Sequence, residues 1–237
     1  MSKELSQFLS VIVPTRNEGH SILFLLERLR YVVPEAEVWL IDGGNDDTPT
    51  RVSSLKNQWQ TFNYLRHEND RGKGHAIQTG IQKATRPLIA QIDADLQFDP
   101  EDLLPLVQCL YADQADFVCG SRFLPLSKKQ MGSVSGLRFF GNRLFSVYTS
   151  LLLQKSFSDV LTGIKAWKRE VTAAFVLRSD SFSYEVELPV KAHRLGFRVT
   201  DIAVGTAPRQ QGQSSVNILK TGLSLLKDIP RFCWEPF

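Results

Sequence analysis

The chain has 237 residues, of which 43% are apolar, and this is enough for one large α/β domain with a continuous core. Its net charge is +3 and its basic residues are dispersed, which argues against a nucleic-acid binder and favours phosphates on a small ligand or a membrane surface as the anionic partner. Three cysteines without C-x-x-C spacing indicate neither a zinc site nor a disulfide framework, and the lack of a signal segment or long apolar run predicts a cytoplasmic protein that does not span a membrane.

Short β-branched runs alternate with segments of helical periodicity along the first half of the chain. In chain order, the pattern predicts strand 11–13, helix 21–32, strand 38–41, helix 48–56, strand 62–65, helix 73–84 and strand 88–92. This alternation implies right-handed crossovers and a mostly parallel sheet. Such sheets bind ligands beyond the carboxyl ends of their strands, and polar clusters follow three of these strands, at 15–18, 42–46 and 93–95.

The second half continues the alternation less regularly. The pattern predicts helix 100–112, strand 117–119, a polar loop over 127–136, helix 137–153, a short segment at 163–167, helix 185–195, strand 198–204, a polar stretch to 215 and helix 216–228. No internal repeat, low-complexity tract or linker interrupts this order.

Asp93-Ala-Asp95 is the most informative motif, because it places two carboxylates directly after the apolar run 87–92, which predicts a buried strand. Two unit charges about 4 Å apart repel by roughly 4 kcal/mol at an effective dielectric near 20, so a cation or an open polar cleft has to relieve them. Oxygen ligands of this kind suit Mg²⁺ or Mn²⁺. A calcium EF-hand is excluded, because Phe98 stands where that loop requires glycine.

Three further polar segments have both a functional and a plain interpretation. The backbone and side chains of segment 14–18 can contact a base or ribose, but taken alone the segment favours a helix cap by Asn17. Asp42 with two following glycines can accept a hydrogen bond from a nucleoside or form only a turn. Lys73, at the start of a predicted helix, favours an anion or is a solvated lysine, and Gly74 in place of Ser or Thr excludes a Walker A loop.

In this order, the motifs resemble the inverting family 2 glycosyltransferases of GT-A fold, most specifically the polyprenyl-phosphate sugar synthases similar to dolichol-phosphate mannose synthase. The resemblance runs from about residue 10 to 215 and rests on segments 13–18, 42–47, 70–74, 93–97 with 99–102, 120–122 and 162–165, on Glu187 and on segment 209–214. It implies an α/β GT-A nucleotide-diphospho-sugar transferase domain over 1–215, with a mostly parallel central sheet flanked by helices. An amphipathic tail over 216–237 would follow.

The resemblance also implies roles for individual residues. Residues expected to bind the nucleotide sugar are Pro14, Arg16, Glu18, Asp42, Lys73, Asp93, Ala94 and Gln97. Residues expected to hold Mg²⁺ or Mn²⁺ are Asp93, Asp95 and Gln97. We expect Asp95, Arg122 and Arg209 to act in catalysis, and Arg138, Asn142 and Arg209 to meet the acceptor phosphate.

Four positions depart from the family pattern. Gly43 replaces the second aspartate of the usual Asp-Asp-Gly, and Ser215 replaces a lysine, which weakens the assignment of phosphate contacts in segment 209–215. Asn142 falls where serine is common. Pro189 interrupts a normally leucine-rich helix. Because proline is favoured in the first turn of a helix, we expect the helix to start near this residue.

The implied reaction moves a sugar from a donor of the GDP-mannose or UDP-hexose type to a polyprenyl or dolichyl phosphate, with inversion. A divalent ion with Arg122 would neutralise the leaving diphosphate. A lipid monophosphate, with a second pKa of about 6, is largely dianionic at pH 7 and needs no general base. A hydroxyl acceptor is the alternative, and would require a carboxylate such as Asp159, Glu185 or Glu187. A non-catalytic nucleotide-binding protein is a second alternative, against which the intact Asp93 and Asp95 argue.

Two segments, 137–153 and 218–237, combine apolar and aromatic residues with lysine and arginine. Basic amphipathic helices of this kind often lie among lipid headgroups, whereas the same patterns also suit core packing. We favour core packing for the first segment and peripheral contact with the cytosolic face of a membrane for the second.

Overall fold

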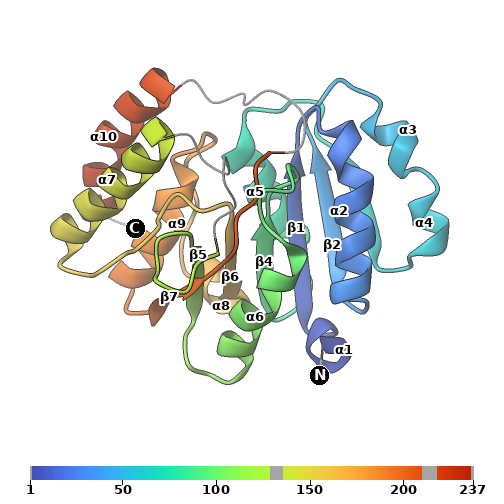
Figure 1. Ribbon diagram of the computed structural model, residues 1–237, viewed down its shortest axis with the longest axis horizontal. Coiled ribbons are helices and arrows are strands. Elements are labelled where there is room, and N and C mark those ends of the chain that lie inside the picture. Colours follow the sequence, from blue (N-terminus) through green and yellow to red (C-terminus); the bar gives the residue numbers. More distant parts are fainter. Residues whose placement is uncertain (1, 129–135, 210–217, 236–237) are drawn as a thin grey trace.

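The computed structural model describes residues 2–128, 136–209 and 218–235. They form a seven-stranded sheet in the order β3-β2-β1-β4-β6-β5-β7, flanked by helices (Figure 1). The strands are β1 (Leu9–Thr15), β2 (Glu37–Asp42), β3 (Phe62–Arg66), β4 (Leu88–Ile92), β5 (Phe117–Ser121), β6 (Ile164–Lys168) and β7 (Val199–Ala203). The helices are α1 (Ser2–Ser6), α2 (Gly19–Val32), α3 (Thr48–Val52), α4 (Leu55–Gln58), α5 (Lys73–Lys83), the 3₁₀ turn η1 (Pro100–Asp102), α6 (Leu103–Tyr111), α7 (Gly136–Leu153), α8 (Arg169–Ala173), α9 (Tyr184–Arg194) and α10 (Ile218–Trp234).

The sheet separates two apolar layers. Val11 and Val13 of β1 face a core shared with α2 and α6, whereas Ile12 between them faces a core shared with α5, α9 and α10. Successive side chains of a strand point to opposite faces, and both faces of this strand are covered. The central strands therefore read as near-continuous apolar runs rather than alternating ones.

The order of the strands creates a crevice beside β1. The chain builds outward from β1 through β2 to β3, and then returns to place β4 on the other side of β1, with β1, β2, β3 and β4 all parallel. The loops that leave β1 and β4 lead to α2 and α6, which pack in the same core on one face of the sheet, and the strand order reverses between them. Ligands of open α/β sheets bind at such a switch point, beyond the carboxyl ends of the strands.

β6 departs from the parallel pattern, because it pairs antiparallel with both β4 and β5. The sequence predicted only a short segment at 163–167, and the structure makes it a central strand. Its register places Lys165 opposite Gln91 of β4. This insertion brings residues from the second half of the chain next to the carboxyl end of β4.

Several predicted helix boundaries were wrong. Predicted helix 48–56 is two short helices, α3 and α4, and η1 precedes α6. Pro189 lies inside α9 rather than at its start. All residues from Tyr184 to Ala192 are buried, so the packing of α9 outweighs the lost hydrogen bond of the proline nitrogen. α10 likewise continues through Pro230 to Trp234, beyond the predicted end at 228.

α10 packs against α9 and α7, with Leu225, Ile229 and Phe232 in the core. Figure 1 shows α7 and α10 side by side at one end of the molecule and α3 with α4 at the other. The division of the chain at residue 215 stays a prediction, because residues 210–217 lie outside the described residues. No helix in the described part of the chain is both long enough and apolar enough to cross a bilayer.

The close approach of α5 to β1 provides a test of the packing. A Cβ added to Gly80 would lie 2.4 Å from Ile12 Cγ2, whereas one added to Gly141 of α7 would meet nothing within 4 Å. We expect Gly80→Ala to lower the free energy of unfolding by about 1–3 kcal/mol through overpacking. Gly141→Ala should raise it by about 0.5–1 kcal/mol through helix propensity. Urea unfolding checks both, and equal effects of the two substitutions would contradict this packing.

Candidate active site

The loops after β1 and β4 meet at the switch point. Ser21 Oγ, in the first turn of α2, donates a hydrogen bond of 2.9 Å to the carbonyl of Ala94. The carboxylate of Glu18 forms an ion pair with Arg209, whose Nη1 also lies 3.9 Å from Asp95 Oδ2. Four residues predicted from the sequence to belong to one site, Glu18, Ala94, Asp95 and Arg209, are therefore neighbours.

A backbone hydrogen bond holds the segment of Arg209 in this position. The amide of Ala207 donates to the carbonyl of Gln97 at 2.9 Å. The amide of Gln97 in turn donates to Asp95 Oδ1 at 3.2 Å. Gln97 therefore orients the Asp95 carboxylate through its backbone, while its predicted role as a metal ligand stays a prediction.

Asp93 lies in a network of buried charges. Lys73 Nζ is 2.6 Å from Asp93 Oδ1 and 2.7 Å from Glu185 Oε1. Lys165 pairs with the other oxygen of Glu185, which also accepts a hydrogen bond of 3.2 Å from Gln91 Nε2. Lys73 thus joins the start of α5 to the end of β4 and to α9.

Glu185 and Lys73 keep their charges despite burial. Burial raises the pKa of Glu185, but Lys165 and Lys73 outweigh burial and hold that pKa at about 2. Burial lowers the pKa of Lys73, but Asp93 and Glu185 outweigh it and raise the pKa well above its ordinary value. Glu185 is therefore an ionised partner of two lysines rather than a free general base.

Asp93 and Asp95 have the features of a divalent-cation site. Asp93 Oδ1 is buried and accepts no well-aligned hydrogen bond from the described residues, although Lys73 lies beside it. Burial, and then the charge of Asp93, raises the pKa of Asp95 to about 6. A Cβ on Gly163 would lie 2.1 Å from Asp93 Oδ2, so only glycine leaves room for this carboxylate. Hard oxygen donors in a half-buried, mutually repelling pair fit Mg²⁺ or Mn²⁺.

Asp42 forms a second polar centre at the ends of β2 and β3. Its buried carboxylate accepts hydrogen bonds of 3.0 Å from Tyr64 Oη, 3.0 Å from Arg66 Nη1 and 2.8 Å from the amide of Gly44. Burial, reinforced by Asp42, raises the pKa of Tyr64 to about 12. Tyr64 and Arg66 escaped the sequence analysis, because only the pairing of β2 with β3 places Arg66 opposite Asp42.

The segment after β1 lies against this centre. Pro14 pairs with Ile41 of β2, and Arg16 Nη1 lies 3.5 Å from Asp70 Oδ2. The predicted cap by Asn17 is wrong. Asn17 Oδ1 instead accepts from the amide of Asn45 at 2.7 Å and so ties the loops after β1 and β2 together.

Arg122 leaves β5 beside the loop that follows β4. Its guanidinium lies 5.9 Å from the ring centroid of Phe98, but it is held by Asp159, with Nε to Oδ2 at 2.6 Å and Nη2 to Oδ1 at 2.8 Å. Burial opposes the charge of Arg122, and Asp159 outweighs burial and raises its pKa. Arg122 thus lies near Asp93 and Asp95, the acidic pair, and is itself bound to Asp159 in a buried ion pair.

The predicted acceptor-phosphate residues are only partly brought together. Arg209 lies beside Asp95, whereas the side chain of Arg138 lies outside the described residues. Asn142 is half-buried in α7, where its carbonyl accepts from Ser146 Oγ at 2.9 Å. The next residue, Arg143, was missed: its guanidinium lies 5.8 Å from the ring of Phe123, which is 5.7 Å from the guanidinium of Arg122.

The three carboxylates considered as general bases are all bound to cations or backbone amides. Asp159 binds Arg122, and Glu185 binds Lys73 and Lys165. Glu187 accepts from the amides of Arg178 at 2.9 Å and Ser179 at 2.8 Å, and pairs with Lys191 at 2.5 Å. Each of them holds buried structure in place.

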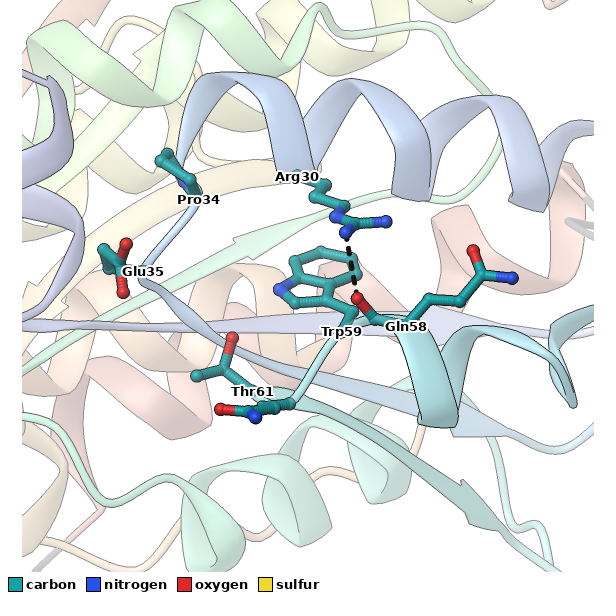
Figure 2. A pocket seen from close by; sticks show the side chains of 7 residues that line it. Arg30, Pro34, Glu35, Gln58, Trp59 and Thr61 are labelled. Carbon is teal, nitrogen blue, oxygen red and sulfur yellow. Dashed lines mark hydrogen bonds between the residues drawn. The ribbon is translucent and has the colours of Figure 1, made fainter.

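A hollow of about 330 Å³ lies elsewhere on the molecule. Figure 2 shows Arg30 donating to the carbonyl of Gln58 above Trp59, with Pro34, Glu35 and Thr61 around them. These residues precede β2 and β3, so the hollow lies at the amino ends of the strands. The acidic pair lies at the opposite, carboxyl end, and the two features are separate.

Comparison with known proteins agrees with this geometry. Residues 10–174 match the family model Glycosyl transferase family 2. Undecaprenyl-phosphate mannosyltransferase of Micrococcus luteus is 26% identical over 213 residues, covering 87% of this chain and 86% of the relative. Glycosyltransferase AglD of Haloferax volcanii is 26% identical over 237 residues, but the chain spans only 37% of that protein.

The fold has a solved counterpart. Glucosyl-3-phosphoglycerate synthase from Mycobacterium tuberculosis, in complex with Mn²⁺, uridine diphosphate and phosphoglyceric acid, superposes with a TM-score of 0.76 at 18% identity. The match covers 100% of this chain and 82% of that protein. The predicted GT-A fold, a mostly parallel sheet flanked by helices, is confirmed.

The Arg122–Asp159 pair is testable through stability. Asp159→Asn leaves a buried guanidinium without its counter-charge, and we expect the free energy of unfolding to fall by about 3–5 kcal/mol. Asp47→Asn removes one partner of an exposed ion pair with Arg51, and should leave the urea midpoint almost unchanged. If Asp159→Asn unfolds at the wild-type urea concentration, the pair does not stabilise the fold.

Proposed function

The chain belongs to glycosyl transferase family 2 and is a nucleotide-sugar-dependent glycosyltransferase, and we propose that its acceptor is a polyprenyl phosphate. Relatives named for undecaprenyl-phosphate and polyprenol substrates support this acceptor. The observation that carries the proposal is that Asp159, Glu185 and Glu187 are all committed to cations or backbone amides. A phosphate nucleophile needs none of them.

For the donor, we assign the nucleoside to the ends of β1 and β2. Asp42 is fixed there by Tyr64 and Arg66, and Arg16 and Glu18 lie on the adjoining loop. The backbone around Pro14 and the glycines after Asp42 allow close approach of a flat base or a ribose. This assignment is compatible with a uracil or guanine nucleotide, and so with a donor of the UDP-hexose or GDP-mannose type.

For the diphosphate, we assign Asp93 and Asp95, with Gln97, to a divalent ion, Mg²⁺ or Mn²⁺. When bound, the ion supplies positive charge against the oxygens of the leaving diphosphate. Lys73 balances the charge of Asp93 from the protein side. Arg209 lies between Glu18 and Asp95, where its guanidinium can neutralise a phosphate oxygen.

The transfer itself then requires orientation more than proton removal. A dianionic phosphate oxygen of the acceptor forms a bond to C1 of the sugar while the bond from C1 to the diphosphate oxygen breaks. The electron pair of that bond leaves with the diphosphate, and attack from the opposite face inverts the anomeric centre. Arg122, held by Asp159, and Arg143, linked to it through Phe123, provide positive charge on the α7 side.

We place the lipid at the end of the molecule formed by α7 and α10. The core-facing sides of these helices bury Leu225 and Phe232, while their outer sides expose Leu219, Leu223, Leu226 and Trp234 on α10 and Phe140, Leu144 and Leu151 on α7. Apolar side chains flanked by basic residues favour the headgroup layer of a membrane. We therefore propose peripheral attachment to the cytosolic face of a membrane, with α7 leading from the lipid to Arg122.

Substitution of Asp95 tests the metal-dependent step. In an assay with Mn²⁺, a labelled nucleotide sugar and polyprenyl phosphate, we expect Asp95→Asn to lower the rate at least about 10²-fold, because stabilisation of the leaving group is lost. Glu101→Gln, at an exposed ion pair with Arg28, should retain wild-type rate.

The same assay separates the two acceptor classes. The matching polyprenyl alcohol should accept no sugar, because Asp159, Glu185 and Glu187 are all bound to cations or backbone amides and cannot activate its hydroxyl. Equal transfer to the alcohol would overturn the acceptor assignment, and full activity of Asp95→Asn would overturn the assignment of the donor site.

Membrane attachment is testable by flotation with vesicles containing anionic lipid. We expect combined Leu223→Ser and Leu226→Ser to weaken the partitioning of the protein about tenfold or more, because each leucine contributes about 1.5–3 kcal/mol when fully buried. Tyr31→Ser removes a residue of α2 that is more exposed than either leucine, at 82%, and should float like the wild type. Equal flotation of all three proteins would exclude this face.

A further inference from the structure

A second group of metal-binding side chains lies outside the site described above. His67 follows β3, Asp70 lies in the next loop and His75 is in the first turn of α5. One ligand atom from each of these residues lies within 4.8 Å of the other two. The two imidazole centroids are 4.1 Å apart, and His67 Nδ1 is 3.9 Å from Asp70 Oδ1. Two of the four histidines of the chain meet here.

Thr79 determines which nitrogen of His67 carries the proton. The Thr79 hydroxyl has one hydrogen, which it donates to the carbonyl of His75 at 3.0 Å. Its oxygen therefore accepts from His67 Nε2, at 3.2 Å. The neutral ring of His67 accordingly carries its proton on Nε2 and has a free lone pair on Nδ1, the form in which imidazole binds a metal.

The Nδ1 atoms of both imidazole rings lack a hydrogen-bond partner among the described residues. His67 Nδ1 and His75 Nδ1 are buried and form no hydrogen bond with any described residue. A buried polar atom without a partner costs about 1–3 kcal/mol. Asp70 lies beside them with its carboxylate oriented by the amide of Gly72, which donates to Oδ1 at 2.9 Å.

From this arrangement we propose that His67, Asp70 and His75 bind a divalent transition-metal ion, for which Zn²⁺ is the best match. Two imidazoles with one carboxylate suit Zn²⁺, whereas Mg²⁺ and Mn²⁺ prefer sites made of oxygen. Ligand bonds of about 2.0–2.1 Å in a tetrahedral site place ligand atoms roughly 3.4 Å apart. The ligand atoms, which lie within 4.8 Å of one another, reach that spacing when each separation shortens by at most about 1.4 Å. None of these three residues is assigned a role in the proposed transfer reaction, although Asp70 also lies 3.5 Å from Arg16.

The ion would connect the end of β3 to the first turn of α5. Between these two points, the chain carries Lys73, the cation that neutralises Asp93. Thr79 acts as the outer partner that orients His67, as groups behind metal ligands commonly do. Zn²⁺ would therefore stabilise the loop that positions Lys73 without touching the acidic pair itself.

The test measures Zn²⁺ binding to the purified full chain by equilibrium dialysis, with excess Mg²⁺ to occupy the acidic pair. We expect the wild type to bind one Zn²⁺ per chain. His75→Gln should bind at least about tenfold more weakly, and Thr79→Val about 10–100-fold more weakly through loss of the outer partner. The matched control is His20→Gln, which removes an exposed imidazole on α2 and should bind like the wild type.

Two further measurements separate this site from the acidic pair and from loss of folding. Asp95→Asn should retain the Zn²⁺, and Zn²⁺ should raise the melting temperature of the wild type but not that of His75→Gln, when both are compared with the chelator-treated proteins. His75 is half-buried, and the melting temperature of the chelator-treated His75→Gln protein shows that this variant is folded. The proposal is overturned if the wild type binds no Zn²⁺, if His75→Gln binds it as tightly, or if Asp95→Asn removes it.

Discussion

The concentration of negative charge at the end of β4 is the constraint on which the rest of the site depends. Asp93 and Asp95 follow a fully buried strand, and their charges have to be balanced in a region with little water. Lys73 balances Asp93 from the start of α5, and Arg209 approaches Asp95 from the segment after β7. Glu185 shares Lys73 and is itself held by Lys165. The site thus consists of two chains of alternating charges, one ending at Asp93 and one at Asp95, and these two like charges meet at the end of β4.

This network explains two features of the fold that packing alone does not. The antiparallel strand β6 brings Lys165 opposite Gln91 and into contact with Glu185, so that a buried lysine and a buried glutamate satisfy each other. Gly163, just before β6, leaves the space that the Asp93 carboxylate occupies. A site built on rigid strand ends in this way holds its charged groups in position before a ligand arrives, which is the arrangement that would best stabilise a leaving diphosphate.

The sequence predicted the repeating part of the fold and the ends of its strands, because periodicity and strand-end polarity are local signals. It did not predict that β6 runs antiparallel, since a short apolar segment carries no information about its direction. The cap assigned to Asn17 failed because its partner, Asn45, belongs to another loop. Arg66 was missed for the same reason: its contact with Asp42 arises only from the register of β2 and β3. Pro189 was misplaced because tertiary packing overrides helix propensity.

We propose that Asp93 and Asp95 hold a divalent ion that would neutralise the diphosphate of the donor. Calorimetric titration of the protein with uridine and guanosine diphosphates, in the presence of Mn²⁺ and again with a chelator, tests it most directly. We expect one of the two nucleotides to bind with Mn²⁺, and its affinity to fall at least about tenfold with the chelator or in Asp93→Asn. Equal affinity under all three conditions would contradict it.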